Sequence, residues 1–140
     1  ENVNEYHHFC NTYLYVISLM SDKNQKTGAY GEQLARKYLE RKGYTIIATN
    51  WHCAYGEVDI IAEYGEILVF VEVRTRHSNT TETAFASITP QKRERLIKTA
   101  YSYLSETERD DELWRIDMIA IALQYGQTPL IQHREDVLDW

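Results

Sequence analysis

Two apolar runs separated by a short turn constrain the fold of this chain most strongly. Residues 57–63 read EVDIIAE and residues 66–75 read EILVFVEVRT, and both are rich in β-branched and other apolar side chains. Such runs are typical of strands that are buried in a sheet. The dipeptide Tyr64-Gly65 lies between them and is a candidate for a two-residue turn, so we expect an antiparallel hairpin.

The segments on either side of this hairpin predict helices that flank a mixed sheet. Apolar residues recur at helical spacing from residue 28 to 42, and Thr89-Pro90 supplies a capping residue followed by proline for a second helix. We assign the buried stripe of that helix to residues 96, 97, 100, 101 and 104. Further strands are expected at residues 44–49, 115–123 and 129–133, with loops at 50–56 and 76–82 and a helical turn near the end. This order predicts an α/β fold.

The length of 140 residues suits one domain with a single sizeable core. Residues 9–20 are rich in apolar side chains, but a membrane span needs roughly 20 residues, so we expect no membrane partner. Met20 directly precedes a polar stretch of the kind that often opens a cytosolic protein. We therefore interpret residues 1–26 as an N-terminal extension and residues 27–140 as the domain.

Charge and cysteine content narrow the class of protein. The net charge of −6 and the pI near 5.3 argue against a nonspecific nucleic-acid coat protein, although a local basic surface remains compatible with them. Cys10 and Cys53 are too few for a disulfide framework and lack CxxC spacing. A reducing, cytoplasmic location is therefore expected.

Each apolar run of the hairpin carries an acid. Asp59 and Glu72 are flanked by Val, Ile and Phe, and a buried ionised carboxylate is costly unless a cation or a metal ion compensates its charge. Two such acids on neighbouring strands, followed by Arg74, resemble half of a metal site. The alternative interpretation is a structural salt bridge in which Arg74 and nearby bases neutralise the acids.

The turn decides whether the two acids can act together. With Tyr64-Gly65 as the turn, Glu63 faces Glu66, and alternation puts one set of side chains on a single face: Glu57, Asp59, Phe70, Glu72 and Arg74. Asp59 then lies opposite Phe70 and Glu57 opposite Glu72. Asp59 and Glu72 become diagonal neighbours about 7–8 Å apart, which allows their oxygens to share Mg²⁺ or Mn²⁺. Such an ion polarises a phosphodiester, and Arg74 would lie near the phosphate.

Basic side chains gather on both predicted helices. The second helix carries Lys92, Arg93, Arg95 and Lys98, and the first carries Arg36 with further Lys and Arg residues. Arg76 extends from the end of the Glu72 strand. Charged helix faces are usually only solvated, but beside an acidic metal site these residues would suit a phosphate backbone.

Three other sets of polar residues receive structural interpretations. Arg115 and Asp117 repeat the pattern of charge within an apolar strand, and we expect a buried structural pair. His7, His8 and His133 are interpreted as surface residues. Glu57 is interpreted as a solvated acid or as one that supports the site, with the alternative that it is a metal ligand if the hairpin register differs.

Several linked motifs resemble those of a known family. They are Gly28-x-x-Gly31-Glu32-x-x-Ala35-x-x-Tyr38-Leu39, Gly43-Tyr44, Asn50, Gly56-Glu57-Val58-Asp59-Ile60-Ile61 and Phe70-Val71-Glu72-Val73-Arg74-x-Arg76, continued by Ile88, Lys92, Arg95, Leu96, Ala100, Tyr103-Leu104 and Arg115-Ile116-Asp117. In these motifs the chain resembles the YraN-like family of uncharacterised bacterial proteins over roughly residues 28–137.

That family is similar in fold to the PD-(D/E)xK endonucleases, especially the archaeal Holliday-junction resolvases. The resemblance implies a restriction-endonuclease-like mixed β-sheet flanked by helices, with Asp59 and Glu72 as ligands of Mg²⁺ or Mn²⁺. It also implies that Glu32 is the acid from the first helix and that Arg74 occupies the lysine position of the motif. Related resolvases act as dimers on two-fold substrates, so a homodimer is implied.

The arginine at position 74 bears on whether the protein cleaves nucleic acid or only binds it. A lysine can release a proton, whereas arginine stays charged and cannot act as the base, so water would have to be activated without a side-chain base. We expect a metal-dependent nuclease that acts on branched or otherwise non-B DNA rather than RNA. The first alternative is a nucleic-acid-binding protein on the same scaffold that does not cleave. The second is a protein-interaction module whose acids form only salt bridges.

Overall fold

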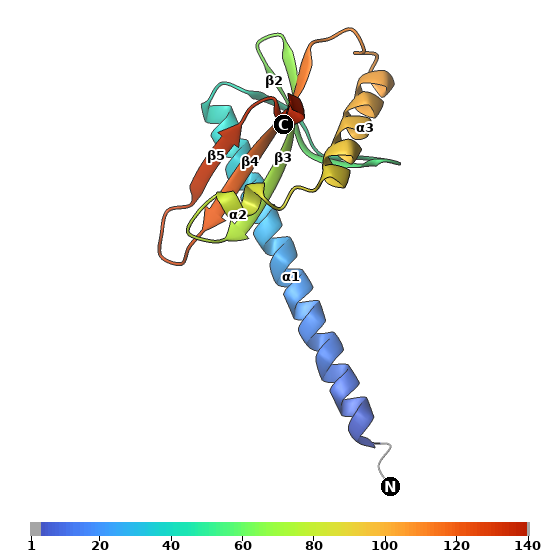
Figure 1. Ribbon diagram of the computed structural model, residues 1–140, viewed down its shortest axis with the longest axis vertical. Coiled ribbons are helices and arrows are strands. Elements are labelled where there is room, and N and C mark those ends of the chain that lie inside the picture. The colour runs from blue at the N-terminus through green and yellow to red at the C-terminus, as the bar shows by residue number, and fades with distance from the viewer. Residues whose placement is uncertain (1–3, 140) are drawn as a thin grey trace.

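The computed structural model describes the backbone of residues 4–139 and the side chains of residues 18–138. A five-stranded sheet lies between helix α1 on one face and helices α2 and α3 on the other (Figure 1). In chain order the elements are α1 (Asn4–Arg41), β1 (Thr45–Cys53), β2 (Gly56–Tyr64), β3 (Ile67–His77), α2 (Glu82–Phe85), α3 (Pro90–Glu106), β4 (Trp114–Leu123), β5 (Leu130–Arg134) and the 3₁₀ turn η1 (Val137–Asp139).

The strands lie in the order β1-β2-β3-β4-β5, and the sheet is mixed. Strands β3 and β4 are parallel, and every other neighbouring pair is antiparallel. A parallel pair needs a crossover connection, and here α2 and α3 provide it. The predicted α/β fold with a mixed sheet flanked by helices is confirmed, and it is consistent with a restriction-endonuclease-like fold.

Two predicted loops are shorter than expected. Strand β1 continues to Cys53, which pairs with Gly56 of β2, so the expected loop at residues 50–56 is a tight turn at Ala54 and Tyr55. Strand β3 continues to His77, and α2 occupies part of the connection that follows. Strand β1 lies at the edge of the sheet, where polar side chains are tolerated. Because of its polar composition, the second part of this strand was interpreted as a loop.

Helix α1 is much longer than the predicted helix of residues 28–42. It begins at Asn4 and crosses residues 26 and 27 without a break, and its first half projects away from the sheet (Figure 1). The division into an extension and a domain therefore stays a prediction. Within the described residues, no helix is both long and apolar enough to cross a membrane.

Each face of the sheet carries its own core. Ala35 and Leu39 of α1 pack on one face, and the other face is covered by a stripe of α3 that contains Leu96, Ala100 and Leu104, as predicted. The expected burial of Tyr101 is wrong: its side chain is 58% exposed, and Tyr103 is buried in its place. The stripe therefore follows the 96, 100, 103 and 104 positions of the helix.

A glycine sets the distance between α1 and the sheet. A Cβ atom added at Gly31 would collide with the Oγ1 atom of Thr75 in β3, and it would also lie 2.9 Å from the Cβ atom of Thr75. Glycine allows this close approach of two backbones. The contact brings the next residue of α1, Glu32, to the edge of the cavity described below.

The β2–β3 hairpin turns one residue later than predicted. Gly65 and Glu66 form the turn, and Tyr64 pairs with Ile67, so the expected turn at Tyr64-Gly65 is wrong. Gly65 has a φ of 60°, which suits the first central position of a tight hairpin turn. Glycine takes this conformation without strain, so the position of Gly65 sets the register of the whole hairpin.

The corrected register changes the partner of Asp59. The last observed pair at that end of the hairpin is Ile60–Val71, and one further step sets Asp59 across from Glu72 instead of Phe70. The correction moves each partner by two positions, which is an even number. It therefore does not exchange the two faces of the strand, and the expectation that the two acids are neighbours survives the misplaced turn.

Candidate functional site

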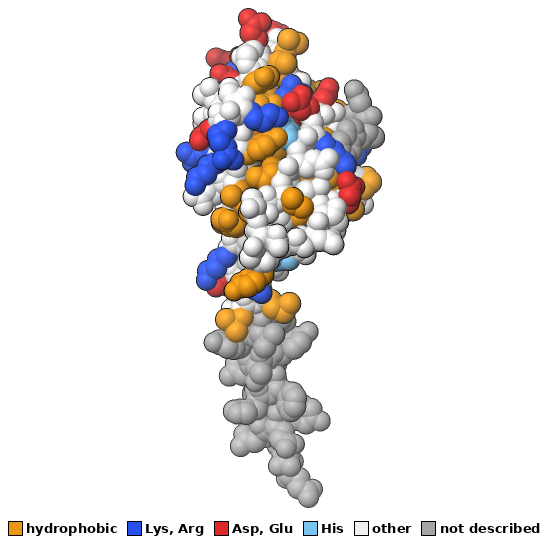
Figure 2. Space-filling model, turned by 90° about the vertical axis from the view of Figure 1, so that its left-hand side faces the viewer, with side chains coloured by type: hydrophobic (Ala, Val, Ile, Leu, Met, Phe, Trp, Pro, Cys, Tyr) orange, Lys and Arg blue, Asp and Glu red, His pale blue; other side chains and the backbone are white. Residues whose placement is uncertain are grey.

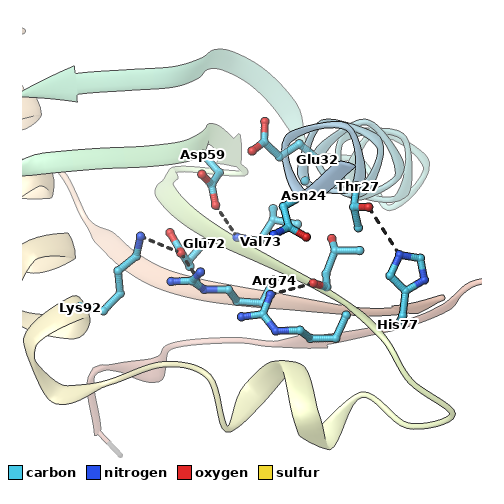
Figure 3. Close-up of a pocket in the computed structure, with 12 residues that line it drawn as sticks. Asn24, Thr27, Glu32, Asp59, Glu72, Val73, Arg74, His77 and Lys92 are labelled. Atoms are coloured by element: carbon cyan, nitrogen blue, oxygen red, sulfur yellow. Dashed lines mark hydrogen bonds and ion pairs between the residues drawn. The ribbon is translucent and has the colours of Figure 1, made fainter. Parts of the chain in front are cut away.

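Strand β2 leaves its pairing with β3 at Asp59. Val58 and Ile61 pack in the same core although strict alternation would place them on opposite faces, so β2 bends between them. The Oδ2 atom of Asp59 accepts a hydrogen bond from the backbone N–H of Val73 at 2.7 Å. The carboxylate thus replaces a strand-to-strand hydrogen bond and is fixed where the sheet opens (Figure 3).

Glu72 is buried beside this opening, with 2% of its surface exposed. Its Oε1 atom lies 3.1 Å from Lys92 Nζ and 3.2 Å from Arg74 Nε (Figure 3). The second contact lacks the geometry of a hydrogen bond, and Glu72 Oε2 has no hydrogen-bond partner among the described residues. Half of this buried carboxylate is therefore unsatisfied, which is costly in a folded protein.

The negative charge of Asp59 is also incompletely compensated, and the pKa of its carboxyl group reflects this. Burial, and then the negative charge of Glu72, raise the pKa of Asp59 to about 8. Glu32 raises it further, whereas the hydrogen bond from Val73 and the charge of Lys92 lower it. A strongly raised carboxylate pKa beside a second acid is typical of sites that await a cation or a proton.

Asn50 holds the third acid in place, and no role was predicted for it. Its Nδ2 atom donates to Glu32 Oε2 at 2.9 Å and to Glu57 Oε1 at 3.2 Å. Asn50 has a φ of 50°, a left-handed conformation that asparagine tolerates better than most residues. Asn50 is among the motif residues that carry the family resemblance, but the residues alone indicated no role for an asparagine within this polar stretch.

Glu57 lies outside the group of acids that the hairpin register had predicted. It pairs with His52 of β1 rather than facing Glu72, and its side chain is exposed. The expected opposition of Glu57 and Glu72 is therefore wrong. The interpretation of Glu57 as a solvated acid agrees with its exposure.

One cavity of about 520 Å³ brings the predicted catalytic residues together. Its lining includes all four of them: Glu32, Asp59, Glu72 and Arg74. Arg76 and Lys92 of the predicted nucleic-acid set also line it, together with His77, which follows Arg76 at the end of β3 and was expected to extend toward nucleic acid with it. Asn24 and Thr27 of α1, for which the sequence indicated no role, complete this part of the lining (Figure 3). His77 of β3 and Thr27 of α1 lie next to each other in this lining, with His77 Nε2 3.5 Å from Thr27 Oγ1.

The remaining predicted nucleic-acid contacts lie around this cavity rather than in it. Arg36 pairs with Glu40 and lines a neighbouring hollow that Asp59 also reaches. Lys98 pairs with Glu94, Arg95 is exposed, and Arg93 lines a separate small cavity behind Glu72. The face drawn in Figure 2 carries Lys and Arg side chains at several places among Asp and Glu side chains, and a group of them lies along one margin.

Asp59 and Glu72 could hold a divalent cation as a pair of ligands, without a larger group of protein ligands around it. Among the described residues no group of three or more His, Cys, Asp or Glu side chains is arranged to hold a metal ion. Mg²⁺ commonly binds through one or two carboxylates and completes its shell with water and phosphate oxygens. The unpartnered Oε2 atom of Glu72 and the raised pKa of Asp59 are the features that such an ion would compensate.

A second buried acid, Asp117 of β4, is satisfied on both oxygens. Arg115 Nε and His133 Nε2 lie 2.9 Å and 2.7 Å from its carboxylate oxygens, and the backbone N–H of Asp136 donates to it at 3.0 Å. The predicted buried pair of Arg115 and Asp117 is confirmed. The surface position expected for His133 is wrong, because its side chain is only 2% exposed. His7 and His8 lie outside the described side chains.

Known proteins similar to this chain share its family. The model of the uncharacterised protein family UPF0102 matches residues 31–121. A UPF0102 protein of Chloroflexus aurantiacus is 47% identical over 109 residues, which cover 77% of this chain and 88% of the relative. A UPF0102 protein of Herpetosiphon aurantiacus is 42% identical over 118 residues, covering 81% and 94%. The chain therefore belongs to the uncharacterised protein family UPF0102, the YraN-like family.

Proposed function

We propose that this protein is a metal-dependent nuclease that hydrolyses phosphodiester bonds in DNA. One observation carries the proposal: Asp59 and Glu72 meet where the sheet opens, and their negative charge is incompletely compensated. A purely structural ion pair would be expected to satisfy both acids. Here both acids line one cavity together with Arg74, and a phosphate in this cavity would lie next to all three side chains.

The residues of the cavity have distinct roles in this proposal. Asp59 and Glu72 would hold Mg²⁺ or Mn²⁺, and the ion would supply Lewis-acid chemistry at the phosphodiester. Arg74 stays charged and would bind the anionic phosphate. Glu32, held by Asn50, would orient a water molecule at the edge of the cavity.

The class of nucleic acid follows from the resemblance to Holliday-junction resolvases and from the basic residues around the cavity. Branched or otherwise non-B DNA is the proposed substrate, and a homodimer in the cytoplasm is part of the same proposal. Arg76 lines the cavity, and Arg36 lines the neighbouring hollow that Asp59 also reaches, so a phosphate backbone that crosses both would meet these two arginines. Analytical ultracentrifugation with and without a four-way junction would test the dimer.

A cleavage panel tests the proposed activity. Single-stranded, duplex, flap and four-way DNA, with an RNA counterpart of each, are incubated with Mg²⁺ or Mn²⁺ and wild-type protein, Asp59→Ala, Glu72→Gln or Glu57→Gln. We expect cleavage of branched DNA, a loss of about 10²-fold or more in the first two variants, and less than about a 3-fold change in Glu57→Gln. Equal activity of Glu72→Gln and Glu57→Gln would contradict the assignment of the site.

A nucleic-acid-binding protein that does not cleave is the second candidate. It is favoured by the ion contacts of Glu72 with Arg74 and Lys92 and by the arginine in the lysine position. Such a protein would bind four-way DNA without turnover. Cleavage that appears only in Arg74→Lys would support this candidate over the nuclease.

A further inference from the structure

Arg74 lies next to Glu72 without a hydrogen bond to it. Its side chain is 25% exposed, and its Nε atom lies 3.2 Å from Glu72 Oε1, but the arrangement does not have the geometry of a hydrogen bond. A guanidinium group is planar, carries its donors in a fixed fork and stays charged. Arg74 can therefore attract a phosphate, but it does not supply the compact ammonium group that a lysine at this position would supply.

A lysine reaches the same acid from the opposite wall of the cavity. Lys92 belongs to the first turn of α3, and its Nζ atom lies 3.1 Å from Glu72 Oε1 (Figure 3). The start of this helix is well defined. The side chain of Thr89 accepts a hydrogen bond from the backbone N–H of Lys92 at 3.1 Å, and Pro90 occupies the first helical position.

The ammonium group of Lys92 retains donors for a ligand. Its side chain is 34% exposed and lines the cavity, whereas Glu72, its only ion-pair partner among the described residues, is almost completely buried. An ammonium group has three N–H donors on a flexible stem. One donor can stay on Glu72 while the others bind an oxygen atom in the cavity.

The other cations of α3 do not share this position. Lys98, six residues further along, lies 3.0 Å from Glu94 on its own helix, and both side chains are more than half exposed. Arg93 lines the small cavity on the other side of Glu72. Lys92 alone among the basic residues that α3 contributes lines the cavity with Asp59 and Arg74.

We infer that Lys92 contacts the substrate directly, binding a non-bridging oxygen of the phosphate that is held at Asp59 and Glu72. It would thus provide from α3 the ammonium group that Arg74 does not provide from β3. The inference rests on the proposed function, since it requires a phosphodiester in this cavity. Glu72 would keep the ammonium group in position until the phosphate arrives.

Variants of Lys92 and Lys26 test this inference in the intact protein. Cleavage of a four-way DNA junction is measured with Mn²⁺, and junction affinity is measured by fluorescence anisotropy with Ca²⁺. We expect Lys92→Met to lose about 10²-fold in cleavage and about 5–10-fold in affinity, since one donor to a developing charge is worth this much. Lys26→Met removes an exposed cation that pairs with Asp22 on α1, and it should change both by less than about 3-fold.

Lys92→Arg separates a substrate contact from a structural ion pair. The variant keeps the positive charge next to Glu72, so its melting temperature should stay within a few degrees of wild type. Its cleavage should still fall by about 10-fold or more, because the broader planar group cannot take the position of the ammonium group. Full cleavage by Lys92→Arg and Lys92→Met would overturn the inference.

The two proposals fail in different ways. If the wild type cleaves none of the DNA substrates, the nuclease proposal fails, and the anisotropy measurements decide the role of Lys92. A selective loss of junction affinity in Lys92→Met then supports the contact, whereas equal losses in Lys92→Met and Lys26→Met overturn it. If the wild type cleaves DNA and Lys92→Met cleaves equally well, only the inference about Lys92 fails.

Discussion

Asp59 and Asp117 look alike in the sequence, but the structure gives them opposite electrostatic states. Each acid lies inside an apolar strand of the same sheet. Burial and the charge of Glu72 raise the pKa of Asp59 to about 8. Burial also acts to raise the pKa of Asp117, but hydrogen bonds from His133, Arg115 and the backbone of Asp136 outweigh it, and the pKa is lowered.

The difference follows from where each acid lies in the sheet. Asp117 is on β4, between β3 and β5, and its donors come from β4, β5 and the segment that follows β5. Asp59 lies where β2 separates from β3, and it receives one backbone hydrogen bond beside a second acid. Complete satisfaction is typical of a structural acid, and the deficit at Asp59 supports its proposed role as a metal ligand.

The largest effect is expected at the satisfied acid. Asp117→Asn removes the negative charge next to His133, which is buried, and next to Arg115, which is largely buried and keeps only the more distant Glu135. Breaking a buried ion pair from one side typically costs about 3–5 kcal/mol. The free energy of unfolding, measured by urea denaturation at pH 7, should fall by this amount.

An exposed partner of the same arginine provides the matched control. Glu135 lies 3.8 Å from Arg115, and its side chain is 54% exposed. Glu135→Gln should therefore change the free energy of unfolding by less than about 0.5 kcal/mol. Similar losses in Asp117→Asn and Glu135→Gln would remove the distinction between the satisfied acid and an ordinary surface charge.

At Asp59, where β2 separates from β3, removal of the charge is expected to increase stability rather than to lower it. Asp59→Asn keeps an acceptor for the N–H of Val73 and removes the charge that burial and Glu72 disfavour. A pKa difference of one unit corresponds to about 1.4 kcal/mol, so we expect the metal-free variant to be more stable than wild type by about 1–3 kcal/mol at pH 8. Calorimetry should also show that it no longer binds Mn²⁺. A destabilised variant that still binds Mn²⁺ would contradict the assigned role.

The pH dependence of stability should separate the two acids. Asp59 has a raised pKa, so the folded protein holds a proton that the unfolded chain releases, and metal-free stability should decline by at least about 1 kcal/mol as pH rises from about 4 to 8. Asp117 has a lowered pKa, so its contribution is complete above its ordinary value of 3.8 and is lost as pH falls through lower values.

Urea denaturation across pH in the presence of a chelator measures both slopes. Asp59→Asn should flatten the decline between pH 4 and 8, and Asp117→Asn should flatten only the loss at acidic pH. A wild-type protein whose stability rises from pH 5 to 8 in a manner dependent on Asp59 would reverse the sign assigned to that acid.

Local patterns in the sequence predicted those parts of the fold that depend on local chemistry. The apolar runs of β2, β3 and β4 identify buried strands, and Thr89-Pro90 identifies the start of α3. The turn was misplaced by one residue, yet the acids remained neighbours because the pairing shifted by two positions.

Contacts between distant elements could not be predicted in the same way. The contact of Lys92 with Glu72 depends on how α3 lies against the sheet, and no periodicity within the helix encodes that placement. The burial of His133 requires knowing that β5 places it beside Asp117. Asn50 looked like a loop residue because β1 is a polar edge strand.

The smallest expected effect concerns the helix cap that positions Lys92. Thr89→Ala removes the acceptor for the backbone N–H of Lys92 and should lower the free energy of unfolding by about 0.5–1 kcal/mol, whereas Thr89→Ser should restore it. If the first turn of α3 helps to hold the ammonium group at Glu72, Thr89→Ala should also reduce junction affinity by about 2-fold. The small loss of stability cannot explain such a reduction, because the variant stays folded. The matched change Thr107→Ala, at the other end of α3, removes a hydrogen bond to Tyr103 and should leave affinity unchanged. Equal affinities for both alanine variants would show that the cap stabilises the helix without positioning Lys92, and the opened edge would then depend on its strands alone.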